Sequence, residues 1–156
     1  MSPLPRLRAH GLGVSPPAGW DAHIYRRADD GDGSTAHPVL HAATIPLPRS
    51  RGDYGTGAVE RLGRDDVLVA LVEHGEEAAG APLFAAEGLP RVAAADFDPR
   101  GLQRTIDGQS GAQWFFHVGR RAFCLYVVLG SHAARARLAP RARELVAALV
   151  IEEGGR

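Results

Sequence analysis

The chain has 156 residues, the length of one ordinary domain, with 18 basic and 18 acidic residues and a formal net charge of +0. This balance excludes a global field that would gather nucleic acid or an anionic membrane. Every basic residue is arginine. The absence of lysine excludes enzymes that use a lysine Schiff base and nucleotide-binding proteins that use a P-loop lysine.

Lysine and asparagine are both absent, as codon pressure in a very GC-rich genome would produce, so we expect a high-GC bacterial source. The single cysteine, Cys124, cannot form an internal disulfide. The opening residues lack the apolar run of a secretory signal, and no stretch reaches the roughly 18 apolar residues of a membrane-spanning helix. These features predict a cytoplasmic protein without a membrane partner.

The beginning of the chain predicts two strands. Residues 1–10 are rich in proline and arginine, and we expect a flexible arm or a short edge segment there. A single domain is then expected over residues 11–152, with a tail at 153–156. Residues 12–14 predict a short strand, and residues 20–27 alternate between two faces after a turn that contains two prolines.

A polar turn and a further strand are expected next. Residues 28–36 carry three aspartates among glycines, but they lack the spacing and the distal glutamate of a calcium loop. Residues 39–45 predict a strand. Residues 46–64 are the most loop-like internal region, with Arg49, Arg51, Asp53 and Tyr54 among the glycines.

Residues 67–73 are apolar on both faces, which indicates a central strand covered on each side or a short buried helix. Their β-branched content favours the strand. Glu73 ends this run, so we expect it to be partly buried and to have an arginine partner or a shifted pKa, with the salt bridge favoured.

The last third predicts a β-hairpin followed by a helix. Residues 75–90 show no clear period, and a turn or short helix is expected near residues 97–102. The aromatic runs at 113–118 and 122–129 alternate as two strands on either side of a turn at Gly119-Arg120-Arg121. Pro140 is expected in the first turn of an amphipathic helix. A short strand reaching Ile151 ends the pattern.

These elements predict an α+β fold, an antiparallel sheet with helices packed on its faces. The segment Gly-Val-Ser-Pro-Pro-Ala-Gly-Trp at residues 13–20 and the ending of two aromatic strands, a helix and a short strand resemble the PsbP/Mog-type fold group. The resemblance covers about half of the chain, and residues 49–107 lie outside it. It implies a binding or assembly factor rather than an enzyme, and it transfers no functional residue.

Two segments offer enzyme-like chemistry. Ser110 lies in Gly-Gln-Ser-Gly-Ala, but a nucleophile elbow needs the pattern G-x-S-x-G followed by a helix, and here a strand follows. The glycine loop at residues 52–57 precedes a weakly helical segment, so its amides could cradle an anion. Its spacing fits neither a dinucleotide fingerprint nor a P-loop, and such glycines usually serve a turn.

Other candidates have simpler interpretations. His37 and His41 are four residues apart, but Pro38 argues against a helix that would aim both at one metal, and no metal or cofactor is expected. Cys124 lies in an apolar strand and is expected to be inert. The last helix carries a group of arginines on a solvated face, at positions 135, 137, 141 and 143. No aromatic side chains are interleaved with them, so this pattern does not favour nucleic-acid binding.

We therefore interpret the sequence as a non-catalytic protein-binding or assembly module. Its expected contact residues are Arg49, Arg51, Asp53 and Tyr54, because tyrosine and arginine most often dominate interface energies. The alternative for this loop, residues 49–57, is a solvent loop or linker whose glycines only keep it flexible. As an exposed loop, this segment is expected to contribute little to stability in either case. The alternative is a small hydrolase or an anion-binding enzyme that uses the glycine loop at 52–57 or Ser110.

Overall fold

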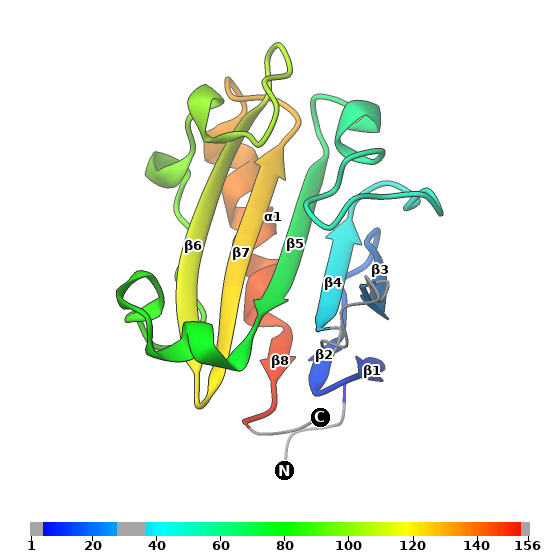
Figure 1. Cartoon of the computed structure of the whole chain (residues 1–156). Helices are drawn as coiled ribbons and strands as arrows, with labels where there is room; N and C mark the ends of the chain where they lie inside the picture. The colour runs from blue at the N-terminus through cyan, green and yellow to red at the C-terminus, as the bar shows by residue number, and fades with distance from the viewer. Residues whose placement is uncertain (1–4, 28–36, 154–156) are drawn as a thin grey trace.

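The computed structural model describes residues 5–27 and 37–153, and the regular secondary structure of that part of the chain is dominated by two antiparallel sheets (Figure 1). The larger sheet has the strand order β3-β4-β5-β7-β6. Its strands are β3 (Asp21–Arg26), β4 (Pro38–Ala43), β5 (Val67–His74), β6 (Ser110–Val118) and β7 (Arg121–Leu129). The smaller sheet has the order β1-β2-β8 and consists of β1 (Leu7–Ala9), β2 (Leu12–Val14) and β8 (Leu149–Ile151).

One α-helix, α1 (Arg135–Ala147), is present among the described residues, together with five short 3₁₀ helices. The 3₁₀ helices are η1 (Val59–Arg61), η2 (Glu76–Gly80), η3 (Pro82–Phe84), η4 (Ala94–Asp96) and η5 (Pro99–Gly101). Figure 1 shows α1 behind β5 and β7. No helix in the described ranges is long and apolar enough to cross a membrane.

Strands β5 and β7 form the centre of the molecule, and both are buried along nearly their whole length. A strand covered on both faces loses the alternation of polar and apolar residues, which is why residues 67–73 are apolar throughout. The expected central strand is confirmed. The two faces of the sheet belong to two separate hydrophobic clusters.

The first cluster fills the space between the larger sheet, α1 and strands β2 and β8. Its buried side chains include Leu71 from β5, Leu125 from β7, Leu138 and Leu145 from α1, and Leu12 from β2. The second cluster covers the opposite face, where Val39, Leu68 and Val128 pack against Leu47 and Ala58. A loop with one 3₁₀ turn therefore covers that face, and α1 covers the other.

The antiparallel sheet and its helix are confirmed, but helices on both faces are not found in the described part of the chain. Residues 7–9 contribute strand β1, which pairs with β2 in register Leu7↔Val14 and is an edge segment. The polar turn expected at residues 28–36 and the chain ends at 1–4 and 154–156 lie outside the described residues.

The expected hairpin is confirmed, with Trp114 opposite Leu125 and Phe116 opposite Phe123 in adjacent antiparallel strands. The turn is shorter than expected because Arg121 begins β7. Gly119 has φ 58°, a left-handed conformation that glycine adopts without steric cost, so the strands can reverse tightly at this point.

The start of α1 differs from the expectation. The helix begins at Arg135 and contains Pro140 in its interior. Pro140 is exposed and lacks the N–H that an interior helical residue donates. Its neighbours Leu138, Ala139 and Ala142 are buried against the sheet, so tertiary packing holds the helix despite the missing hydrogen bond.

Candidate functional site

Residues 47–62 lie across the face of the larger sheet that belongs to the second hydrophobic cluster, here called the second face. The segment is attached to this face by side chains of the predicted contact residues. Arg51, Asp53 and Tyr54 are only partly exposed, whereas Arg49 is exposed. The expectation of a freely exposed loop is therefore wrong for three of these four residues. Their polar groups meet a row of side chains on β3, β4 and β5.

His41, fully buried on β4, lies at the centre of this contact. Its Nε2 donates to the carbonyl oxygen of Asp53 (2.7 Å), and its Nδ1 accepts from Nε of Arg51 (2.9 Å). A neutral imidazole with its proton on Nε2 satisfies both bonds. Burial lowers the pKa of His41 to about 4, which keeps the ring in this neutral form at neutral pH.

Asp53 connects the segment to β3 and to Arg27, the residue that follows β3. The hydroxyl of Tyr25 donates to Oδ1 of Asp53 (3.0 Å), and Nε of Arg27 lies 3.7 Å from Oδ2. The guanidinium of Arg51 lies 5.8 Å from the centre of the Tyr25 ring. Burial, followed by the hydrogen bond to Asp53, raises the pKa of Tyr25 well above its usual value.

Tyr54 packs against the other end of the same face. Its ring meets that of Tyr126 edge to face at 5.8 Å, and its hydroxyl lies 3.4 Å from Nε2 of His74 and also contacts the Cys124 thiol. Burial raises the pKa of Tyr54 to about 12 and that of Cys124 to about 11. Both groups therefore stay protonated at neutral pH.

The glycine loop at residues 52–57 uses its amides internally. The amide of Gly52 donates to the carbonyl of Thr56, that of Gly55 to Gly52, and that of Gly57 to a carboxylate oxygen of Glu60 (2.7 Å). Gly57 has φ 99°, and a β-carbon there would lie 2.6 Å from the carbonyl oxygen of Ser50. These glycines serve a tight turn, and the following helix η1 has only 3 residues.

The other chemical candidates lie apart from one another. Ser110 is the first residue of β6 and is fully buried, and its Oγ has no hydrogen-bond partner. His37 precedes β4, and His41 is engaged as described. No group of three or more histidine, cysteine or acidic residues that could hold a metal occurs in the described ranges.

The expected salt bridge of Glu73 is present, and its partner is Arg121. The two side chains are 8% and 6% exposed, and Nη2 of Arg121 lies 2.6 Å from Oε1 of Glu73. Both come from the central strands. The pair faces the smaller sheet, so its position indicates a structural role.

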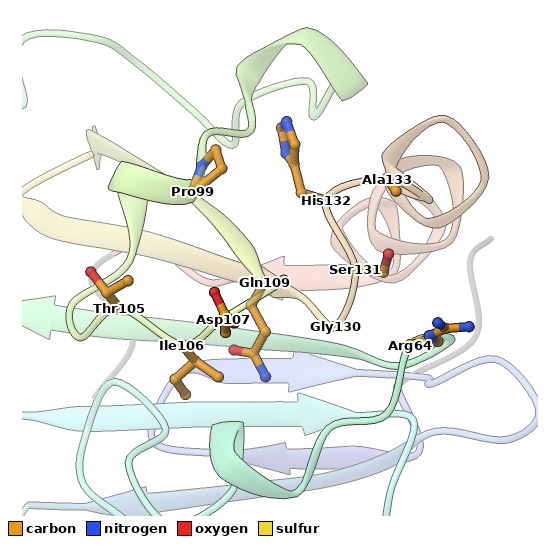
Figure 2. Close-up of a pocket in the computed structure, with 11 residues that line it drawn as sticks. Arg64, Pro99, Thr105, Ile106, Asp107, Gln109, Gly130, Ser131, His132 and Ala133 are labelled. Atoms are coloured by element: carbon orange, nitrogen blue, oxygen red, sulfur yellow. The ribbon is translucent and has the colours of Figure 1, made fainter.

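A pocket that the sequence did not reveal lies at the end of the sheet where β6 begins and β7 leads into α1 (Figure 2). It has a volume of about 590 Å³. Its lining includes Arg64, Asp107, Gln109, Ser131 and His132. The backbone amide of His132 donates to the carbonyl of Gly108 (2.7 Å) and joins the two sides. The glycines at 108 and 111 mark a turn near this pocket in the sequence, but nothing in the sequence indicates Arg64 or His132 as lining residues.

No family model, curated protein or solved structure matches this chain.

Proposed function

We propose that this protein is a non-catalytic binding or assembly module, and that the contact surface for its protein partner is the segment of residues 49–57 on the second face of the sheet. The observation that carries this proposal is the display of Arg49, an exposed arginine that forms no ion pair or side-chain hydrogen bond with any described residue. Arginine is among the residue types that most often dominate interface energies.

The attachment of the segment supports this role. Hydrogen bonds from Arg51 to His41 and from Tyr25 to Asp53 tether residues on both sides of Gly52 to the sheet. A loop held in one conformation loses less entropy on binding than a mobile loop does. The tethering residues thus serve as supports for the surface, and Arg49 is its central contact.

The charges of this surface favour an acidic partner. Asp53 is already engaged by Tyr25 and Arg27, so its carboxylate is partly neutralised within the protein. Arg49 remains as an unpaired positive charge, and Arg51 is half-buried beside it in sequence. Opposite charge on the partner would speed association and orient the complex.

The chemistry of the described residues favours binding over catalysis. Ser110 is buried and its hydroxyl has no hydrogen-bond partner among the described residues, while the high pKa of Cys124 disfavours a thiolate. The amides of the three loop glycines, Gly52, Gly55 and Gly57, are occupied by hydrogen bonds within the protein.

The proposal is tested by comparative affinity purification from the source cells with tagged parent protein and the Arg49→Glu variant. Reversing a central interface charge is expected to reduce recovery of the partner roughly tenfold. Because Arg49 is exposed, the melting temperature should stay within about 2 °C of the parent value.

The matched control is Arg120→Glu, which reverses an exposed charge at the β6–β7 turn, away from the segment. A true partner is recovered by the parent and by Arg120→Glu but is lost with Arg49→Glu. Equal recovery with all three proteins would reject the segment as the interface.

A further inference from the structure

We propose that the pocket between the start of β6 and the start of α1 binds a small organic or inorganic anion that also carries a hydrogen-bond donor, such as a hydroxycarboxylate or a dihydrogen phosphate. This site is independent of the surface proposed above, because it lies on other residues and involves no partner protein. Four features of the pocket carry the inference.

The first feature is a cation without a partner. Arg64 lines the pocket, is exposed, and its guanidinium forms no ion pair or hydrogen bond with any described residue. Nearby Arg137 is paired with Asp65 (2.7 Å). A guanidinium has five donors in a planar fork that suits carboxylate and phosphate oxygens, so Arg64 is free to hold an anion.

The second feature is the direction of α1. Ser131, His132 and Ala133 line the pocket and directly precede this helix of 13 residues. The N-terminal end of a helix carries a partial positive charge, which favours an anion close to its first turn. The hydroxyl of Ser131 accepts from the amide of Ala134 (3.3 Å), so its proton is available to a ligand oxygen.

The third feature is the buried and unpartnered carbonyl of Gln109. This side chain is 4% exposed, and its Nε2 donates to the carbonyl of Val59 (2.8 Å), which assigns the other amide atom as oxygen. That Oε1 has no hydrogen-bond partner. Figure 2 shows the Gln109 side chain beside Asp107 among the residues that line the pocket.

The fourth feature is the grouping of orphaned atoms at this corner. Nδ1 of His132 and Oγ of Ser110 are also buried without partners, and Ser110 adjoins Gln109 in sequence. Buried polar groups in native proteins are nearly always paired, so the two unpartnered atoms in the pocket lining, on Gln109 and His132, indicate partners supplied from outside the chain. Gln109 Oε1 can only accept, which is why the ligand needs a donor.

The carboxylate of Asp107 limits which anions the pocket can bind. Asp107 is exposed and lines the same pocket. Its carboxylate repels a second negative charge but can accept from a ligand hydroxyl. Oε1 of Gln109 and Nδ1 of His132 are buried, so a ligand contacts Arg64 and Ser131 first and reaches these two atoms only after the lining side chains shift.

The test is an NMR titration of the full chain at constant ionic strength with three probes: acetate, glycolate and inorganic phosphate. Saturable shifts are expected at the amides of Gly108, Gly130 and residues 131–134. Glycolate should bind roughly threefold more tightly than acetate, because only glycolate adds a hydroxyl donor. The ratio of glycolate to phosphate affinity distinguishes a carboxylate ligand from a phosphate ligand.

Arg64→Gln is the test variant, and Arg61→Gln is the control, since Arg61 is exposed on η1 outside the pocket lining. Arg64→Gln should weaken binding of the best probe about fivefold, and Arg61→Gln should leave it unchanged. The proposal would be overturned if the parent and Arg64→Gln bound the probe equally well, or if both variants lost the same amount of affinity. The absence of a saturable shift with every probe would also overturn it. Equal affinity for acetate and glycolate would overturn the requirement for a donor.

Discussion

Arg121 and Glu73 form a buried ion pair that joins the two sheets of the protein. Nε and Nη2 of Arg121 donate to the two carboxylate oxygens of Glu73 at 3.0 and 2.6 Å. The same guanidinium donates to backbone carbonyls of Gly11 and Glu152 (3.0 Å each) and of His10 (3.3 Å), next to β2 and β8. One side chain therefore connects β5 and β7 to the smaller sheet.

Removing Arg121 should destabilise the protein strongly. Arg121→Met leaves the Glu73 carboxylate buried without a partner, and we expect a loss of about 3–5 kcal/mol in the free energy of unfolding, measured by urea denaturation. Arg120→Met, at the exposed neighbour, should change it by less than about 0.5 kcal/mol. Combining Arg121→Met with Glu73→Leu should restore at least about 1 kcal/mol, because the uncompensated charge is then absent. A single change that costs under about 1 kcal/mol would contradict this role.

The segment on the second face should contribute to stability. Changing Arg51 and Tyr54 together to Ala removes the hydrogen bond to His41 and the ring packing on Tyr126. We expect a loss of about 2–4 kcal/mol in urea denaturation. This differs from the sequence-based expectation of little change. Arg49→Ala, which removes only an exposed side chain, serves as the control; a similar loss there would argue against the tethering contacts.

The stability of the protein should decrease as the pH is lowered, because His41 is buried in its neutral form. The unfolded histidine takes up a proton near pH 6.5, whereas burial holds the folded pKa at about 4, so the unfolded state binds more protons between these values. The free energy of unfolding is therefore expected to decrease by up to about 3 kcal/mol from pH 6.5 to pH 4. His74, whose pKa burial also lowers, adds to the slope. His41→Gln should flatten the profile, and an unchanged slope would show that His41 does not cause it.

Replacing Pro140 should stabilise the protein. Pro140 lies in the interior of α1, and Pro140→Ala restores an amide donor there. It also removes the steric conflict that an interior proline ring generally has with the preceding turn. We expect the free energy of unfolding to rise by about 1–3 kcal/mol. Ala147→Pro, near the other end of the helix, is the opposite control and should destabilise it. A decrease on changing Pro140 would mean that its ring contributes packing that the helix needs.

The two candidate nucleophiles should be unreactive in the folded protein. Cys124 is buried, with a pKa of about 11, and Ser110 is buried without a base. A thiol-specific disulfide reagent should label Cys124 only after urea unfolding, and a fluorophosphonate should not label Ser110 in either state. Stoichiometric labelling of Ser110 in the folded protein would instead support the hydrolase alternative.

Several elements could be predicted because their causes are local. Alternation in the aromatic runs predicted the β6–β7 hairpin, and the doubly apolar run over residues 67–73 predicted the covered central strand. The carboxylate at the end of that run predicted an ionic partner for Glu73. In each case the pattern of neighbouring residues reflects the environment of the element itself.

The features that only the tertiary structure decided depend on residues far apart in the chain. Sequence composition alone made residues 46–64 a loop, but His41 and Tyr25 on the sheet determine that the segment lies flat on it. The sequence pattern places Arg121 in a turn, but its burial depends on the distant β2 and β8. The pocket of Arg64, Gln109 and His132 likewise forms where three separate segments meet. Local patterns encode which face of an element is buried, whereas partners across the fold are chosen by packing, which no short stretch of sequence contains.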